Sequence, residues 1–203
     1  MKKLLVCFIM LAGAMLLQAQ VRRTPVQRTQ TQQRSATQVA AKTFTLTNGK
    51  LGPIQTGVRF ANIPAIYVGL YDKYTYKKIK HESDMEDDWT EEYYQFTKAG
   101  RNIFRVGIYD GKICGITLQE GSSGIIKTQE GYYVGYPART LFTKKRMEWT
   151  TYFEGTSFAT SGHYTYHINI EDLTGNEYPT NANQIKPNAK ICMIVYNHDV
   201  ETY

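Results

Sequence analysis

The sequence predicts an α+β fold, with antiparallel sheet covered on one face by short helices and arranged as two related units. Short runs of alternating apolar and polar residues recur from Thr43 onward, a pattern typical of half-buried strands. Asn48-Gly49 and Asp110-Gly111 separate such runs, and both dipeptides favour the tight turn of a β-hairpin. A glycine-centred segment, Ile54–Ile63, has a counterpart 78 positions later, Tyr132–Leu141.

The two glycine-centred segments share a spacing. In each, an apolar residue lies three positions before the glycine, Gly57 or Gly135, and another lies six positions after it. We interpret each as a short strand, a glycine turn and the start of a helix, and we expect Pro64 to cut the first helix short. The best helix candidate is Ala138–Met147. The units are then residues 43–124 and 125–203, so that the Gly-Ser-Ser-Gly stretch ends the first.

Strands are expected where apolar alternation and aromatic residues coincide. Residues 172–188 are rich in Asn, Thr, Gly and Pro, which indicates a long loop. The expected strands are Tyr74–Tyr76, Trp89–Thr97, Ile103–Tyr109, Ile113–Leu118, Tyr132–Val134, Trp149–Phe153, His163–Ile170 and Ile191–Tyr196.

The N-terminus predicts export. Lys2 and Lys3 precede an apolar run, Leu4–Leu17, and a small residue, Ala19, offers a cleavage site. This is the pattern of a secretory signal peptide, residues 1–19, and it places the mature protein in the periplasm or outside the cell. The run is too short to span a bilayer, and no other stretch approaches its length, so no transmembrane segment is expected.

Residues 20–42 are rich in Gln, Thr and Arg and contain neither an acid nor an aromatic residue. Such a segment cannot bury enough apolar surface to fold, so we expect a disordered basic linker. The whole chain carries a formal net charge of +6. This modest excess on an exported protein does not favour a nucleic-acid partner.

The first glycine segment resembles a known family. Ile54-Gln55-Thr56-Gly57 followed by Ile63 is similar to the I-x-x-G-M-x-x-x-x-V opening of small envelope domains of the SmpA/OmlA type, although Val58 stands where Met is usual. The hairpin ending Gly111-Lys112-Ile113 fits the same pattern. Beta-lactamase inhibitor proteins look like a tandem of this architecture. The resemblance implies a binding domain with helices on one face of the sheet and an open face rich in aromatic residues.

Two cysteines remain after the predicted cleavage, Cys114 and Cys192. Export to an oxidising compartment allows a disulfide between them. Because both lie in apolar alternation typical of strands, two buried thiols in neighbouring strands are the other interpretation. The sequence leaves both open.

One segment raises the question of hydrolase chemistry. Gly155-Thr156-Ser157-Phe158-Ala159 resembles the G-T-S-M-A stretch around the nucleophilic serine of subtilisin-type enzymes. That chemistry requires a histidine base within hydrogen-bond reach of the serine. The upstream His81 has none of the expected sequence context, so we interpret Ser157 as a turn residue and a small serine hydrolase as the weakest hypothesis.

No metal site or cofactor is expected. His163 and His167 lie about 13 Å apart if they stand on a strand, too far to share an ion. The acidic run Glu82–Glu92 has Trp89 where a calcium-binding EF-hand loop requires Gly, which excludes that motif. A solvated loop and an irregular calcium site both remain open.

Aromatic residues are abundant, with 16 Tyr, 8 Phe and 2 Trp. They either fill the core or present a binding surface, because Tyr and Trp contribute large contact area at low entropy cost. The leading hypothesis is an exported, non-enzymatic binding module of the bacterial cell envelope with a protein partner; the alternative is an inhibitor of a secreted or periplasmic hydrolase. The predicted binding residues are Trp89, Tyr93, Tyr133, Tyr152, Tyr164 and Tyr166.

Overall fold

The computed structural model describes residues 42–82, 88–145, 148–153, 155–175 and 179–198. All of these belong to one compact unit, Val39–Tyr203. The predicted signal peptide lies outside the described residues, as does the predicted linker except for Lys42.

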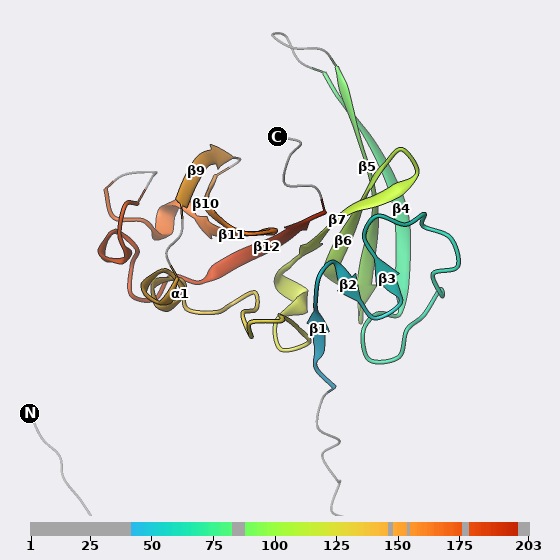
Figure 1. The fold of residues 1–203 in the computed structure, drawn as a ribbon, viewed down its shortest axis with the longest axis horizontal. Helices are drawn as coiled ribbons and strands as arrows, with labels where there is room; N and C mark the ends of the chain where they lie inside the picture. Colours follow the sequence, from blue (N-terminus) through green and yellow to red (C-terminus); the bar gives the residue numbers. More distant parts are fainter. Residues whose placement is uncertain (1–41, 83–87, 146–147, 154, 176–178, 199–203) are drawn as a thin grey trace, which may run out of the picture. The chain divides into compact units, whose positions relative to one another are not determined.

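The main feature is an eight-stranded antiparallel sheet with the order β4-β5-β6-β7-β12-β11-β10-β9 (Figure 1). It consists of two four-stranded meanders that meet where β7 pairs with β12. The mostly antiparallel α+β architecture is therefore confirmed, and both meanders lie in one sheet. The strands are β4 Lys73–His81, β5 Trp89–Lys98, β6 Arg101–Tyr109, β7 Lys112–Leu118, β9 Glu148–Phe153, β10 Thr156–Ser161, β11 Tyr164–Asn169 and β12 Ile191–Asn197.

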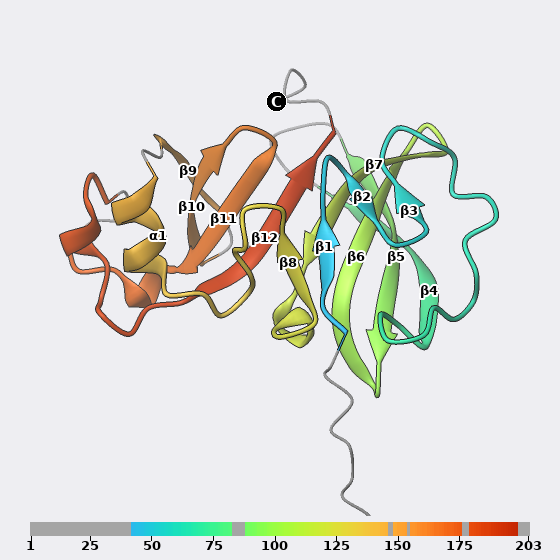
Figure 2. The same ribbon diagram turned by 60° about the horizontal axis from the view of Figure 1, so that its bottom comes forward.

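Shorter elements lie on one face of this sheet (Figure 2). They are the parallel pair β1 (Phe44–Leu46) and β8 (Ile126–Thr128), the hairpin of β2 (Lys50–Leu51) and β3 (Ile54–Gln55), and helix α1 (Ala138–Lys144). Among the described residues α1 is the one α-helix. Three single-turn 3₁₀ helices complete the elements: η1 Glu120–Ser122, η2 Ile170–Asp172 and η3 Ala182–Gln184.

The face beneath these elements, here called the covered face, carries the core. The strand registers align Phe96, Phe104, Leu118, Ile194 and Tyr166 in one row across five strands. Each of these side chains has no exposed surface. Burial of such a side chain stabilises the fold by about 1.5–3 kcal/mol, so this row ties the two meanders together. The opposite face, here called the outer face, carries the alternate row Gln95, Arg105, Thr117, Val195 and Thr165.

Both predicted hairpin turns are confirmed. Asn48 and Gly49 have φ values of +47° and +71°, and Asp110 and Gly111 have φ values of +49° and +69°. Positive φ at both central positions is the requirement of a type I′ turn, which Asn-Gly and Asp-Gly meet at low cost. The second turn joins β6 to β7, the hairpin that the sequence predicted most clearly.

The two glycine turns make matching backbone hydrogen bonds. Gly57 N donates to Ile113 O at 2.8 Å, and Gly135 N donates to Ile191 O at 2.7 Å. In return Ile113 N donates to Val58 O, and Ile191 N donates to Tyr136 O. Each glycine has positive φ and ties the segment after it to the first residues of the last strand in its meander.

Two local predictions are wrong. No helix follows Gly57, because the chain runs irregularly to Pro64 and the Phe60 ring instead stacks on Tyr94 with ring centroids 3.6 Å apart. Tyr132–Val134 is a loop rather than a strand, and β8 is the strand that precedes it. β8 lies beyond the predicted unit boundary at residue 124 yet pairs with β1.

The cysteines occupy β-bulges. Ile113 and Gly115 pair with consecutive residues of β6, which leaves Cys114 as the extra residue, and Cys192 holds the same place in β12 against β11. Because β7 and β12 are antiparallel, these positions lie at opposite ends of the strand pair, about 20 Å apart along it. No disulfide joins them, since that bond needs Cα atoms within about 7 Å. Cys114 is exposed, so the interpretation as two buried thiols is also incorrect.

Candidate functional site

The predicted binding residues separate into three groups. Tyr164 and Tyr166 lie on the covered face and are buried, with 6% and 0% of their surface exposed, so their assignment to a binding surface is wrong. The Tyr164 hydroxyl donates to Leu46 O at 3.0 Å, and burial raises the pKa of Tyr164 to about 12. Tyr133 is exposed in the loop before α1. Tyr152 belongs to the edge strand β9, and its side chain lies outside the described residues.

Trp89 and Tyr93 lie on the outer face of β5, near the end of a projecting hairpin. β4 and β5 pair over their full length to His81 and Trp89, whereas β6 pairs with β5 only as far as Glu92. The last residues therefore form a two-stranded extension beyond the third strand, which Figure 1 shows projecting from the sheet. We call Lys78–His81 together with Trp89–Glu91 the arm.

Five side chains form a continuous series of contacts from the arm onto the outer face. The His81 ring stacks on Trp89 with centroids 3.8 Å apart, and His81 Nε2 lies 3.7 Å from a Glu91 carboxylate oxygen. Glu91 pairs with Arg105 at 3.0 Å, and the Arg105 guanidinium lies 5.4 Å from the Tyr93 ring centroid. We call His81, Trp89, Glu91, Tyr93 and Arg105 the outer-face cluster.

The outer-face cluster combines an exposed aromatic side chain, Trp89, with a cation whose position is fixed by its partners, Arg105. Trp89 is 49% exposed, whereas the Arg105 side chain is 34% exposed between its two partners. A paired and stacked guanidinium loses less side-chain entropy when it binds than a free one does. Sequence reasoning found Trp89 and Tyr93 but missed Arg105, which stands in another strand. The alternation of apolar and polar residues in β6 could have shown which face of the strand Arg105 occupies. It could not have shown that Arg105 lies beside Tyr93 of β5.

Ion pairs hold the opposite side of the arm. Lys78 Nζ lies 2.7 Å from Glu92 Oε1, and the Tyr76 hydroxyl donates to Glu92 Oε2 at 2.9 Å. The hydrogen bond from Lys78 holds the pKa of Glu92 below its usual value, and Tyr76 adds to this. Lys80 pairs with Asp88 at 2.7 Å. Exposed pairs of this kind contribute little to stability, so their main effect is on the geometry of the arm.

The serine hydrolase hypothesis meets a geometric obstacle. Ser157 lies within β10 rather than in a turn, is fully buried and pairs with Ile168 on the covered face. His167, one strand away, lies on the outer face, where its Nδ1 is 3.1 Å from Thr156 Oγ1. Burial, together with Arg105, lowers the pKa of His167 to about 4. Side chains on opposite faces of a sheet cannot form the hydrogen bond that activates a serine nucleophile.

Metal ligands do not gather in the described part of the chain. No group of three or more His, Cys, Asp or Glu residues there could hold a metal ion. His163 is exposed in the turn between β10 and β11, and its ring nitrogen lies 3.1 Å from Asn197 O. Asp84 and Glu86, two of the acids considered for an irregular calcium site, lie outside the described residues. Glu91 and Glu92 belong to β5.

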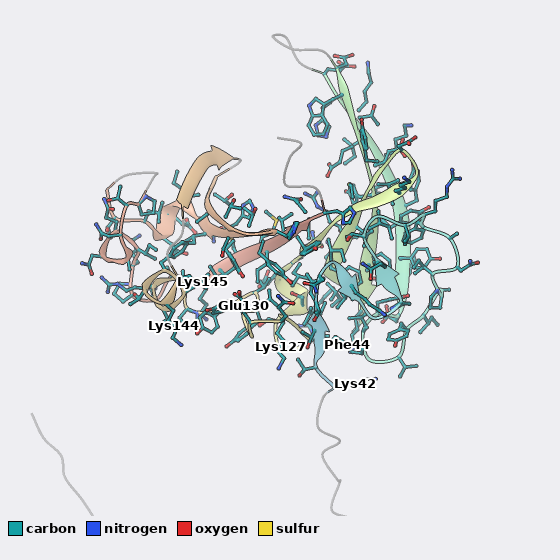
Figure 3. The ribbon with its side chains drawn as sticks, in the orientation of Figure 1. Lys42, Phe44, Lys127, Glu130, Lys144 and Lys145 are labelled. Atoms are coloured by element: carbon teal, nitrogen blue, oxygen red, sulfur yellow. The ribbon has the colours of Figure 1, made fainter. Side chains whose placement is uncertain are left out.

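A second charged surface lies over β1, β8 and α1 (Figure 3). Lys145 pairs with Glu130 at 2.5 Å and lies 5.7 Å from the Tyr132 ring centroid. Lys127 and Lys144 are exposed nearby, so the side chains described on this surface are mostly basic.

Comparison with known proteins identifies no family. No family model matches the chain, and no curated protein matches it. The crystal structure of the uncharacterized protein yfeY from Escherichia coli is similar to it, with 14% sequence identity, coverage of 77% of this chain and 99% of that chain, and a TM-score of 0.47. In the described residues no helix has the length and apolar character needed to cross a membrane. The resemblance to SmpA/OmlA-type domains stays a prediction.

Proposed function

We propose that this protein is an exported, non-enzymatic binding protein of the bacterial cell envelope that holds a protein partner through the outer-face cluster. One observation carries the proposal: Trp89 on the projecting arm and Tyr93 and Arg105 at its base lie on the same face, with Trp89 half exposed. Trp, Tyr and Arg are the residue types that dominate binding energy at protein interfaces.

The chemistry around the cluster favours a protein over a small ligand. The cluster lies on an open strand face rather than in a cleft, and the charged Lys77 lies beside Tyr93 on the same face. A central aromatic anchor with a polar rim is the common arrangement of protein interfaces. Ser157 and His167, which lie on opposite faces, support the non-enzymatic part of the proposal.

We further propose that the two meanders are copies of one unit. A shift of 78 residues relates Gly57 to Gly135, Ile113 to Ile191 and Cys114 to Cys192, with the same hydrogen bonds and the same bulge in each half. Applied to the central strands, the shift exchanges the pairs Ile116–Tyr196 and Leu118–Ile194. An approximate two-fold axis through the Thr117–Val195 pair accounts for this exchange.

Site-specific photo-crosslinking tests the binding function. The full chain carries a benzophenone amino acid at Ile79, which is 39% exposed on the arm, and is produced in its own cells. We expect a discrete protein adduct after irradiation. The control places the same group at Tyr109, which is 79% exposed at the β6–β7 turn, and should give no such adduct.

A Trp89→Ala change in the Ile79-labelled chain should remove the adduct and leave the melting temperature nearly unchanged, because surface substitutions usually change stability by less than about 0.5 kcal/mol. Equal adducts from both positions, or an adduct that survives Trp89→Ala, would contradict the proposal.

A hydrolase inhibitor is the second candidate, and the projecting arm is the observation that favours it. A narrow two-stranded extension with an exposed Trp89 can enter an enzyme cleft. Stoichiometric loss of activity of the crosslinked enzyme would distinguish this role from passive binding.

A further inference from the structure

A polar cleft lies at the end of the sheet opposite the arm. Its volume is about 1020 Å³, and it is walled by the start of β6, the end of β7 with η1, the turn at Gly135 and the start of β12. This is large enough for a small organic ligand. The lining residues are Arg101, Asn102, Gln119, Glu120, Gly121, Ser123, Val134, Gly135, Asn169, Asp172, Asn188, Lys190, Ile191 and Cys192.

The lining carries balanced charge and many amides. Two cations, Arg101 and Lys190, are matched by two acids, Glu120 and Asp172. Four amide side chains add groups that both donate and accept hydrogen bonds: Asn102, Gln119, Asn169 and Asn188. None of the lining residues is aromatic, so the cleft has no platform on which a sugar ring or a nucleobase could stack.

Several polar side chains of the cleft are available to a ligand, although Gln119 Oε1 already accepts a hydrogen bond from Gln95 Nε2 at 2.8 Å. Within the described part of the chain, the side chains of Arg101, Asn169, Asp172, Asn188 and Lys190 form neither a hydrogen bond nor an ion pair. The arm shows the opposite pattern, since its Lys78, Lys80 and Glu91 are all paired.

The wall formed by η1 is tightly constructed. A Cβ at Gly121 would lie 2.2 Å from Asn102 O, so only glycine lets η1 approach the start of β6 this closely. The buried Ser122 hydroxyl donates to Gln119 O at 2.6 Å and holds the turn that follows β7. These contacts fix Gln119 and Glu120 at the edge of the cleft.

The matching place beside Gly57 is filled instead. There His198 Nδ1 lies 3.1 Å from Thr56 Oγ1, and a Cβ at Gly57 would lie 2.7 Å from His198 Nε2. The residue 78 positions before His198 is Glu120, which turns away into η1. The same backbone around a glycine turn therefore forms a cleft at Gly135 and is covered by His198 at Gly57.

We propose that this cleft binds a short peptide in its zwitterionic form. The charges alternate across the sheet in the order Arg101, Glu120, Lys190 and Asp172, so an acid would hold the amino terminus, a cation the carboxylate, and the amide side chains the peptide groups between them. The balanced charge argues against a simple anion or cation, and the absence of aromatic lining argues against an oligosaccharide. The inference is independent of the outer-face cluster.

Titration of the full chain with trialanine, followed by NMR of the Asn and Gln side-chain amides and by calorimetry, tests the proposal. We expect saturable binding that Lys190→Ala and Asp172→Asn each weaken about tenfold, because a charge-assisted hydrogen bond is lost in each. Trialanine with both termini blocked should bind about a hundredfold more weakly, since it loses both charges.

The chain offers a matched control in Lys112. Lys112 forms an isolated antiparallel β-bridge with Arg59, and Lys190 forms the equivalent bridge with Pro137. Both lysines are exposed, but of the two only Lys190 lines the cleft. Lys112→Ala should therefore leave trialanine affinity unchanged. Asn188→Ala, on an exposed loop, serves as a second cleft variant whose folding is not at risk.

Four outcomes would overturn the proposal. They are the absence of saturable shifts with trialanine, equal binding of the blocked peptide, an equal loss of affinity in Lys112→Ala and Lys190→Ala, and binding of a neutral trisaccharide such as maltotriose in place of the peptide. The last outcome would assign the cleft to sugars.

Discussion

The turns at Gly57 and Gly135 share their backbone and differ in their surroundings. Both glycines have positive φ. The backbone N–H of each donates to the carbonyl oxygen of an isoleucine near the start of the last strand of its meander, Ile113 or Ile191. Gly57 packs against His198, whereas Gly135 opens onto the polar cleft. Glycine therefore sets the path of the chain in both places, while side chains from distant segments decide whether a site forms there.

The two meanders differ in the same manner. The first has an extended hairpin of nine and ten residues, and the second has two six-residue strands in the matching place. Gly107 and His167 both stand immediately before the bulge of their strand pair. A Cβ at Gly107 would lie 3.0 Å from Cys114 Sγ, whereas the second meander buries an imidazole at this place.

The largest expected effect comes from His167, which has no counterpart in the first meander. Burial and Arg105 lower its pKa from 6.5 to about 4, so between these values the unfolded chain binds a proton that the folded chain does not. The free energy of unfolding should therefore fall as the pH drops from 6.5 to 4, by about 3 kcal/mol, and no such loss should occur above this window. Urea denaturation of wild type and His167→Gln across pH 4–8 measures it.

The difference between the two stability curves isolates His167, because other groups titrate in both proteins. His163→Gln, which changes an exposed ring in the neighbouring turn, is the matched control and should follow the wild-type curve. Parallel curves for wild type and His167→Gln would show that the imidazole does not set the pH dependence.

A smaller effect separates the two glycine turns. Gly57→Ala and Gly135→Ala should each cost about 1–2 kcal/mol, because both positions have positive φ. Gly57→Ala should lose about 1 kcal/mol more, since its Cβ displaces His198 from Thr56, whereas the nearest atom at Gly135 is Ser123 Oγ at 3.3 Å.

A double-mutant cycle checks the cause of this difference. In a His198→Ala background the two alanine substitutions should cost the same, as measured by chemical denaturation. A difference that persists without the histidine would place its origin in the backbone rather than in the packing of His198.

Local patterns predicted the strands and tight turns because their causes lie within a few residues. Asn48-Gly49 and Asp110-Gly111 supply positive φ wherever they stand, and because side chains alternate along a strand, Trp89 and Tyr93 share a face of β5. Alternation cannot say which face will be covered, because the covering elements come from elsewhere in the chain. Tyr164 and Tyr166 were predicted as binding residues for this reason, although both are buried and the Tyr164 hydroxyl donates to Leu46 O of β1.

The cleft and the partners of Trp89 could not be predicted, because each joins segments far apart in the sequence. Arg105 reaches Tyr93 through the β5–β6 register, and a bulge at Ile103 of β6, opposite Phe96 and Thr97, shifts that register by one residue near the turn. The cleft depends on how Gly121 packs against Asn102, a contact between η1 and the start of β6 that no local pattern encodes.

The smallest expected effect concerns the two cysteines, whose matched bulges differ in exposure. Cys114 is exposed, whereas Cys192 is half-buried, donates to His167 O at 3.3 Å, and has its pKa raised by burial to about 11. Because the thiolate is the reactive form, N-ethylmaleimide at pH 7 without reductant should label Cys114 at least about tenfold faster than Cys192, with little change in stability. Peptide mapping by mass spectrometry at successive times measures both rates. Equal rates would mean that the bulge alone sets reactivity. Protection of both thiols until a reductant is added would instead support a disulfide between Cys114 and Cys192.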